Sequence, residues 1–250
     1  MITTQQSRNT GLPSISVITV VYNSVKSIEQ TIESVLEQDY PNLEYIIIDG
    51  GSTDGTIQLI KKYENRISLF LSEPDNGIYD AMNKGVSRAH GEWINFMNSG
   101  DCFHKSEVLK TIFLNTIDVN ISFIYSDYYI QKKNVKKLYH ASFKKGLILH
   151  QSCIYKKSLH KDFGKYYVSK PIIISDYLFF NLIPKENYLK TEVVISENDG
   201  NGISSGRWII AQKYCLDYVF QRIGLFQMLY LIIIGYIKFG LLCVFYKFSK

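Results

Sequence analysis

Blocks of apolar residues alternate with helix-like patterns over the first hundred residues of the chain. Four short apolar runs, rich in β-branched residues, predict buried strands at Ser16–Tyr22, Leu43–Asp49, Ile67–Ser72 and Trp93–Met97. Between them, apolar positions recur every three to four residues, as on one face of a helix, at residues 27–38, 56–63 and 76–89. Strands that alternate with helices predict an α/β fold, in which a mostly parallel central sheet is flanked by helices.

The remainder of the chain has a weaker pattern. We expect a helix near residues 106–115, a helix at Ser175–Leu182 and a strand at Glu192–Ser196, while residues 121–130 and 135–143 are stretches rich in tyrosine and isoleucine. Ser27, with Gln30 three residues later, predicts a capping box at the start of the first helix. The chain therefore divides into a leader (1–13), an α/β domain (14–210, with halves 14–101 and 102–210) and an apolar helical extension (211–250).

Composition narrows the class of protein. The 250 residues carry a formal net charge of +5, which is too small and too dispersed to indicate nucleic-acid binding but suits phosphorylated ligands or anionic lipid. The four cysteines form no CxxC or zinc pattern, which favours reduced thiols. No apolar signal segment lies near the first residue, so we expect the α/β domain to face the cytoplasm.

Polar and acidic residues cluster where the predicted strands end. Tyr22-Asn23 follow the first strand, Asp49 ends the second and runs into GGSTDG, and Asn98 and Asp101 follow the fourth. Ligands of open α/β sheets bind outside the carboxyl ends of the strands. Glycine lets the backbone approach a ligand, and a carboxylate accepts hydrogen bonds from a nucleobase or a ribose. The pattern predicts a nucleotide site at this edge of the sheet.

Four segments together resemble the inverting, GT-A-fold glycosyltransferases of family 2: VITVVYN, EYIIIDGGSTDGT, SEPDNGIYDAMNKGVSRAHGEWINFMNSGD and HQS. The resemblance covers roughly residues 14–206 and is strongest to the branch that builds exopolysaccharide, colanic-acid-type and O-antigen-type glycans. It implies a GT-A (Rossmann-like) fold. It also implies transfer of a sugar, with inversion, from a UDP-, GDP- or dTDP-sugar to a glycan or lipid-linked acceptor.

The resemblance implies roles for individual residues as well. The positions that it assigns to the donor nucleotide or sugar are Thr19, Tyr22, Asn23, Asp49, Ser52, Asp54, Asp75, Asn76, Gly77, Asp80, Asn83, Lys84, Asn98 and Gly100. Asp176 matches the acid that serves as catalytic base, and His150-Gln151 match a pair near the acceptor. Asp101 matches the metal-binding acid, which implies Mg²⁺ or Mn²⁺ as the cofactor.

Physical chemistry agrees with these roles, with one departure from the family pattern. A hard divalent cation needs only one or two carboxylates when a diphosphate and water complete its shell, and it offsets charge on the leaving group. A carboxylate opposite the leaving group takes the proton of the attacking hydroxyl. The family often has two or three acids at the metal position, whereas this chain reads Asn-Ser-Gly-Asp and leaves Asp101 as the charged ligand. We therefore expect metal binding that leans on the diphosphate.

Ordinary structural roles compete with these assignments. Asp49 and Asp54 could simply form turns, and Asp80 and Asp176 could lie on exposed helix faces. His150 could be a packing residue. His104 lies close enough to Asp101 in the sequence to suggest a metal ligand, but a helix-capping or exposed position is favoured.

The segment Ile223–Tyr246 is almost continuously apolar. Its run before Lys238 has about 15 residues, or about 22 Å of helix, whereas a membrane span needs about 20. We expect an interfacial or re-entrant helix at the cytoplasmic face of the inner (plasma) membrane, with nearby lysines and arginines at the lipid headgroups. A buried helix pair, packed on the α/β domain or in a homodimer, is the alternative.

Two other functions compete with sugar transfer. A sugar nucleotidyltransferase shares the strand-end geometry, but it usually has a basic glycine-rich loop after the first strand, where this chain has Tyr22-Asn23-Ser24-Val25. A membrane-tethered nucleotide-sugar-binding protein with weakened catalysis would explain the thinned Asn-Ser-Gly-Asp motif. The four spaced motifs favour the glycosyltransferase.

Overall fold

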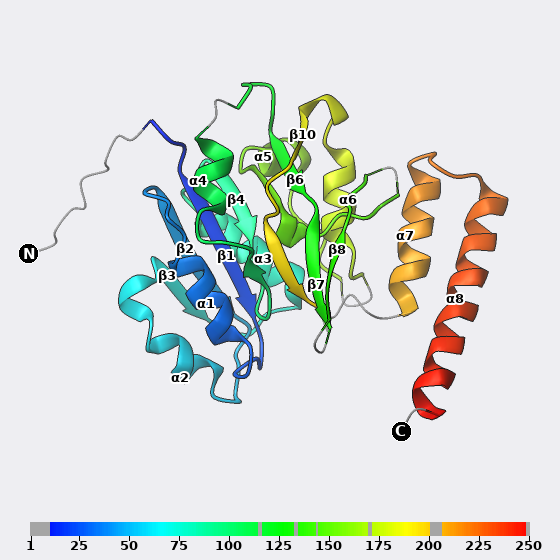
Figure 1. The fold of residues 1–250 in the computed structure, drawn as a ribbon, viewed down its shortest axis with the longest axis horizontal. Helices are drawn as coiled ribbons and strands as arrows, with labels where there is room; N and C mark the ends of the chain where they lie inside the picture. Colours follow the sequence, from blue (N-terminus) through cyan, green and yellow to red (C-terminus); the bar gives the residue numbers. More distant parts are fainter. Residues whose placement is uncertain are drawn as a thin grey trace, which may run out of the picture.

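A seven-stranded sheet forms the centre of the computed structural model, which describes residues 11–114, 117–132, 135–143, 145–169, 172–200 and 207–248 (Figure 1). Its strands run in the order β10-β6-β9-β4-β1-β2-β3. Their bounds are β1 Ile15–Val21, β2 Leu43–Asp49, β3 Leu69–Ser72, β4 Trp93–Phe96, β6 Phe123–Ser126, β9 Cys153–Lys156 and β10 Tyr188–Thr191. Only β9 runs antiparallel to its neighbours among these strands. The predicted α/β fold with a mostly parallel sheet is confirmed.

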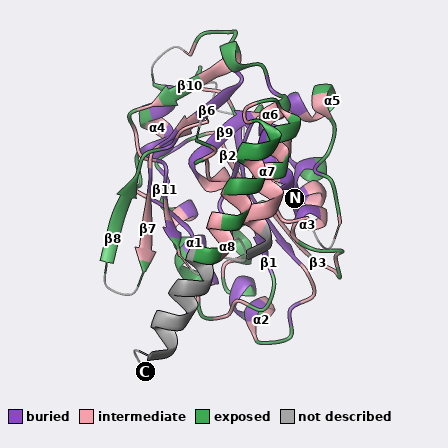
Figure 2. Ribbon diagram, turned by 90° about the vertical axis from the view of Figure 1, so that its right-hand side faces the viewer, coloured by how far each residue is buried: buried purple, intermediate pink, exposed green. Residues whose placement is uncertain are grey.

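Helices cover both faces of this sheet. Helices α1 (Ile28–Leu36), α2 (Thr56–Lys61) and α4 (Val108–Phe113) bury their apolar residues in the cluster on one face. Helices α3 (Ile78–Arg88), α5 (Leu159–Phe163) and α6 (Ser175–Leu182) do so on the other. Short 3₁₀ turns lie at Glu64–Arg66, His150–Ser152 and Lys185–Asn187. The inner strands of the sheet are largely buried (Figure 2), which accounts for their continuous apolar sequences.

Register and close packing fix the position of the site. Strands β1 and β2 pair in parallel along their whole length, so that Val21 lies opposite Asp49 and the two following loops emerge side by side. On the far side of β1, Gly85 lets α3 pack closely, because a Cβ there would lie 2.6 Å from the Ile18 side chain. The start of α3 is thereby held beside the same loops.

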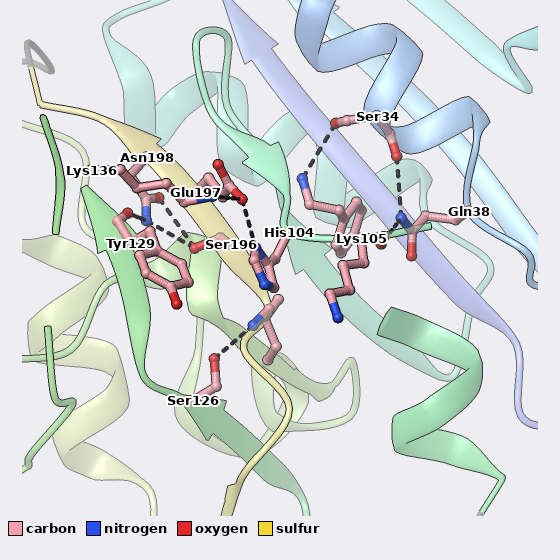
Figure 3. Close-up of polar contacts among 12 residues, drawn as sticks. Ser34, Gln38, His104, Lys105, Ser126, Tyr129, Lys136, Ser196, Glu197 and Asn198 are labelled. Atoms are coloured by element: carbon pink, nitrogen blue, oxygen red, sulfur yellow. Dashed lines mark hydrogen bonds and ion pairs between the residues drawn. The ribbon is translucent and has the colours of Figure 1, made fainter. Parts of the chain in front are cut away.

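A second, smaller sheet joins segments that are far apart in the sequence. Strands β5 (Cys102–Phe103), β11 (Ser196–Asp199), β7 (Tyr128–Lys132) and β8 (Val135–Tyr139) pair in that order. Figure 3 shows polar side chains bridging them: His104 Nδ1 lies 2.6 Å from Glu197 Oε1, to which Lys136 also binds, and Asn198 donates to the Tyr129 carbonyl at 3.0 Å. His104 therefore pairs with an acid of β11, rather than capping a helix or lying free in solvent.

The C-terminal segment forms two helices, α7 (Arg207–Val219) and α8 (Leu225–Phe248), which pack against each other at one side of the molecule (Figure 1). A Cβ at Gly235 of α8 would lie 2.5 Å from Ile210 of α7, so these helices approach closely there. Of residues 209–237, whose side chains are described, only Asp217 is buried. No helix in the described part of the chain is long and apolar enough to cross a membrane.

Most of the predicted elements are present, with shifts of a few residues at their ends, and α6 has the predicted bounds. Two local predictions are wrong. The side chain of Ser27 makes no cap hydrogen bond and contacts Ser99 Oγ at 3.2 Å, because α1 begins against the loop after β4. The strand expected at Glu192–Ser196 is a break between β10 and β11, where the chain passes from the large sheet to the small one. The predicted division into domains stays a prediction, and residues 1–10 and 201–206 lie outside the described part.

Candidate active site

The loop after β2 is organised around Asp49. This side chain is fully buried, and its carboxylate accepts hydrogen bonds from the Gly51 and Ser52 amides, both at 3.0 Å, and from the Ser52 and Ser72 hydroxyls, at 2.5 and 2.7 Å. Both oxygens are thus used inside the protein. Asp49 shapes the loop that would meet a nucleotide, and the structure gives its carboxylate no exposed surface for direct contact.

The loop after β1 is tied to the same turn. Asn23 has φ 46°, an uncommon conformation for a non-glycine residue, and its side chain accepts a hydrogen bond from the Thr53 amide at 2.8 Å. Its own amide donates to Ser52 Oγ at 2.7 Å, while Asp54 accepts from the Val25 amide at 3.1 Å. Strain in a well-bonded loop is typical of binding sites. Next to these bonds, Tyr22 leaves 62% of its surface exposed.

Thr19 has a structural position. Its hydroxyl is buried within β1, where it donates to the Met97 carbonyl at 2.7 Å and contacts the Tyr45 hydroxyl at 3.0 Å. These contacts give the Thr19 hydroxyl a structural role in the sheet, and its predicted contact with the nucleotide stays a prediction.

The segment before α3 crosses over the β2 loop. Asp75 accepts a hydrogen bond from the Gly77 amide at 2.8 Å, and Asp80 accepts from the Asn76 amide at 2.9 Å, so both acids stabilise the turn into the helix. Further along, Lys84 donates to the Pro74 carbonyl at 2.9 Å and Asn83 exchanges hydrogen bonds with the Tyr166 backbone. The predicted donor-binding motif is thus also the framework that holds this segment in place.

Asp101 lies at the junction of the two sheets. It is 6% exposed, its Oδ2 accepts from Gln151 Nε2 at 2.5 Å, and its Oδ1 accepts from the Asp199 amide at 2.9 Å. Burial raises the pKa of Asp101 to about 6, although the hydrogen bond from Gln151 acts in the opposite direction. Gly100 has φ 98°, and a Cβ placed on it would lie 3.5 Å from the Asp199 side chain, so the backbone runs close to that residue.

The oxygen atoms around Asp101 fit a hard divalent cation. The side-chain oxygens of Asn98 and Gln151 are buried and have no hydrogen-bond partner in the described part of the chain. Unpaired amide oxygens beside a carboxylate are the ligand type that Mg²⁺ and Mn²⁺ prefer. Among the described residues, no group of three or more His, Cys, Asp or Glu side chains could hold a metal. A metal here would therefore take few protein ligands and several diphosphate oxygens.

Asp176 is joined to the Asp101 region by a chain of polar contacts. His150 Nδ1 lies 2.9 Å from Asp176 Oδ2, and Asn98 Nδ2 lies 2.7 Å from the other ring nitrogen. Because the Asn98 amide donates to Nε2, the proton of the ring lies on Nδ1 and His150 donates to Asp176. Tyr79 donates to the second carboxylate oxygen, Oδ1, at 2.8 Å. Tyr79 and His150 thus contact the Asp176 carboxylate directly, and Asn98 reaches it through His150, so three residues from three separate segments surround it.

The environment of Asp176 keeps it ionised. Burial alone would raise its pKa, but the hydrogen bonds from His150 and Tyr79 outweigh burial and lower the pKa below the usual value. Burial and the neighbouring carboxylate raise the pKa of Tyr79 far above its ordinary value, so its hydroxyl remains a donor. A negative carboxylate with two fixed donors is a suitable proton acceptor for a bound hydroxyl.

A cavity of about 320 Å³ opens beside these residues. It is lined by the start of α3, from Asp75 to Tyr79, and by Ser169, Ile172 and Ile173. A larger hollow of about 570 Å³ lies between the end of α3 and the β9–α5 region, which contributes four lysines to it, and Asn83 is the only predicted site residue on it. The smaller cavity, next to Asp75 and Tyr79, is therefore the one that belongs to the candidate site.

Two residues of this site are absent from the sequence-based assignment. Tyr79 lies inside the DNGIYDAMNKG segment, but the motif assigns it no role of its own. Asp199 lies 98 residues from Asp101 and belongs to a strand whose pairing the sequence pattern does not show. His150 and Gln151 contact the two key acids directly, and their position near the acceptor stays a prediction.

Comparison with known proteins identifies the family. Residues 16–171, more than half of the chain, match the sequence profile of Glycosyl transferase family 2. The chain belongs to glycosyl transferase family 2. This transferase is 40% identical over 103 residues to the putative teichuronic acid biosynthesis glycosyltransferase TuaG of Bacillus subtilis, a match that covers 40% of this chain and 41% of TuaG. It spans about two fifths of the length of this and other curated relatives.

Two solved structures show the same fold. Staphylococcus aureus TarS in complex with UDP-GlcNAc has a TM-score of 0.67 and 20% identity, covering 81% of this chain and 66% of that one. The mannosyltransferase PcManGT of Pyrobaculum calidifontis, in complex with GDP-Man and Mn²⁺, has a TM-score of 0.66 and 18% identity, covering 86% and 66%. The GT-A fold implied by the sequence motifs is confirmed.

Proposed function

We propose that this transferase moves a sugar from a nucleotide diphosphate sugar to a lipid-linked glycan acceptor, with inversion at the anomeric carbon, in surface-polysaccharide synthesis. The observation that carries the proposal is Asp176, held as a carboxylate between His150 and Tyr79 beside the cavity at the start of α3. The donor-bound structures of TarS and PcManGT support the donor class, and the similarity to the putative teichuronic acid biosynthesis glycosyltransferase TuaG supports a glycan product.

In the proposed reaction, the acceptor oxygen forms a bond to the anomeric carbon while the bond from that carbon to the diphosphate oxygen breaks. Asp176 takes the proton of the acceptor hydroxyl during this single displacement. His150 and Tyr79 keep the carboxylate in one orientation, because each binds a different oxygen. Attack opposite the leaving group inverts the configuration of the sugar.

We also propose that Asp101 binds Mg²⁺ or Mn²⁺, with the amide oxygens of Asn98 and Gln151 nearby. When bound, the cation would neutralise negative charge on the diphosphate. The buried position of Asp101 excludes bulk water, which strengthens that interaction. EDTA-treated samples should therefore lose transfer, and Mn²⁺ should restore it.

The test of the function is a transfer assay with a panel of UDP-, GDP- and dTDP-sugars and a lipid-linked acceptor. Asp176→Asn keeps the size of the side chain but cannot take a proton at neutral pH, so kcat should fall roughly 10²- to 10⁴-fold. Binding of the nucleoside diphosphate should not change. Asp162→Asn, at an exposed acid of α5, is the matched control. Full transfer by Asp176→Asn would refute the assignment of the base, and absence of turnover in the native chain would favour a binding protein.

We further propose that α8 places the enzyme on the cytoplasmic face of the inner membrane. Phe226, Leu229, Tyr230, Ile233 and Ile237 recur at helical spacing and are each 46–86% exposed. This apolar stripe has no covering element in the described part of the chain, because α8 packs on α7 with the side that carries Gly235. After Asp217 the sequence has no acidic residue and four basic ones, which complements an anionic lipid surface.

Vesicle flotation tests the membrane proposal. The full chain should float with vesicles of phosphatidylcholine and phosphatidylglycerol and much less with phosphatidylcholine alone. Phe226→Glu with Ile233→Glu should abolish flotation, whereas Val119→Glu, at an apolar residue that is 82% exposed on the α/β domain, should not. Flotation unaffected by the stripe variants would refute the proposal. If the same variants instead convert a dimer into a monomer, a second copy covers the stripe.

A further inference from the structure

Helix α7 follows the α/β domain in the sequence, but one of its side chains reaches the candidate site. Gln212 Oε1 accepts a hydrogen bond from the backbone amide of Ile173 at 3.0 Å, and Figure 1 shows α7 beside α6. Ile173 lines the cavity of about 320 Å³ on the side opposite the start of α3, and α6 begins two residues after it. A side chain of α7 therefore fixes the backbone of one wall of the cavity.

A second contact between α7 and α6 lies next to the catalytic carboxylate. Tyr177, which follows Asp176 in the first turn of α6, donates a hydrogen bond to Asp217 Oδ1 at 2.7 Å. Asp217 is buried, and Lys213 and Arg222 form ion pairs with it at 2.9 and 3.2 Å. Displacing any member of such a buried cluster leaves a charge without its partner, so the cluster favours one arrangement. The position of the first turn of α6 thus depends on α7.

The segment that leads to His150 packs against the same cluster. Gly146 has φ 60°, and a Cβ placed on it would collide with the Lys213 side chain and lie 2.6 Å from the Tyr177 hydroxyl. Glycine therefore lets this segment approach both side chains. Four residues later the chain reaches His150, whose ring contacts Asp176. The cavity wall, the first turn of α6 and the segment before His150 therefore all meet at α7.

We propose that Gln212 is a positioning residue for the donor sugar nucleotide, and that α7 is a working part of the active site as well as the connection to α8. This inference rests on the proposed function, which places the donor in the cavity beside α3. Gln212 acts through Ile173 and does not touch the donor. Without an acceptor for its amide, Ile173 leaves its place in a share of the molecules, and the apparent affinity for the donor falls by the same share.

The test compares Gln212→Leu with Gln212→Glu. Leucine has a similar size but offers no acceptor to the Ile173 amide, whereas glutamate supplies one. The assay measures kcat and KM of the full chain, with Mn²⁺, for the donor that the native chain uses from the panel of UDP-, GDP- and dTDP-sugars. In Gln212→Leu, the donor KM should rise about 5- to 50-fold. Saturating donor selects the molecules whose wall is in place, so kcat should change less than about twofold. Gln212→Glu should keep a KM close to the native value.

Further variants separate positioning from a general loss of stability. Ile112→Val shortens a buried side chain of α4, on the other face of the sheet, and it should lower stability without changing the donor KM. Gln212→Asn, whose amide is one methylene shorter, gives a second test if Gln212→Leu does not fold. A native donor KM in both Gln212→Leu and Gln212→Asn, or an equal rise in Gln212→Glu or Ile112→Val, would overturn the role of Gln212 while sugar transfer stands. Absence of turnover by the native chain with every donor of the panel would overturn the proposed function itself.

Discussion

Replacing Asp101 by asparagine should make the protein more stable and inactive at the same time. The side chain is almost fully buried, and asparagine has nearly the same shape. Its oxygen can still accept from the Asp199 amide. Its new NH₂ group would face Gln151, whose amide can turn so that Oε1, which has no donor in the described part of the chain, accepts from it. The substitution therefore removes a buried charge and leaves the surrounding hydrogen bonds largely intact.

The magnitude follows from the pKa of Asp101. Burial raises this pKa from 3.8 to about 6, and one pKa unit corresponds to 1.36 kcal/mol, so the buried charge costs about 3 kcal/mol. Because the folded-state pKa is raised, the carboxyl contributes stability only while it is protonated. That contribution is complete below about pH 4 and is lost as the pH rises through about 6. At pH 7 the asparagine variant should be more stable by about 3 kcal/mol, and near pH 5 by roughly half of that.

Urea unfolding in EDTA, at pH 7 and pH 5, measures this difference without metal. The gain at pH 7 corresponds to a rise in Tm of roughly 6–12 °C for a chain of this size. Asp162→Asn, at an exposed acid, should change stability by less than about 0.5 kcal/mol. Sugar transfer by Asp101→Asn should be lost, because the proposed metal ligand is gone. A variant less stable than the native chain at pH 7, or a gain of equal size at both pH values, would refute the argument from burial.

Two other substitutions test the packing around Asp176 and α7. Tyr79→Phe removes one donor to Asp176, so the pKa of this acid should rise and the acidic limb of the kcat–pH profile should move to higher pH. The control is Tyr166→Phe, which removes a hydroxyl that contacts Tyr155 and should leave the limb in place. Asp217→Ala should lower the free energy of unfolding in urea by roughly 3–5 kcal/mol, because it leaves the neighbouring lysine and arginine without their buried partner. A change below 1 kcal/mol would show that this pair is effectively solvated.

The first half of the fold could be predicted because its signals are local. Strands β1, β2 and β4 are continuous, largely buried runs, and each helix between the first four strands has its own apolar face, so pattern and structure agree within a few residues. The second half depends on pairing between distant segments. Strand β9 runs antiparallel to both of its neighbours, β4 and β6. Strand β11 pairs with β5, from which it is separated by more than ninety residues of sequence. No short window of sequence contains the information for those pairs.

The same distinction applies to the site. Motif spacing located the loops correctly, since loops that follow parallel strands must meet at one edge. It could not tell which side chains face a ligand and which hold the loop. Asp49 and Asp80 are bound within their own turns, whereas His150 and Tyr79 reach Asp176 from other elements. That outcome depends on hydrogen-bond partners 26 and 97 residues away, which periodicity does not reveal.

Helix α3 accounts for the compactness of the DNGIYDAMNKG motif. Asp75 lies in the turn just before the helix and Asp80 in its first turn, while Tyr79, one position before Asp80 and rotated by about 100°, points to Asp176. Gly85, farther along, fixes the depth of the helix against β1. A single helix therefore sets the distance between the predicted donor-binding turn and the proposed catalytic carboxylate. A shift of α3 would disturb both contacts together, which is why one short motif must satisfy nucleotide binding, packing and catalysis at once.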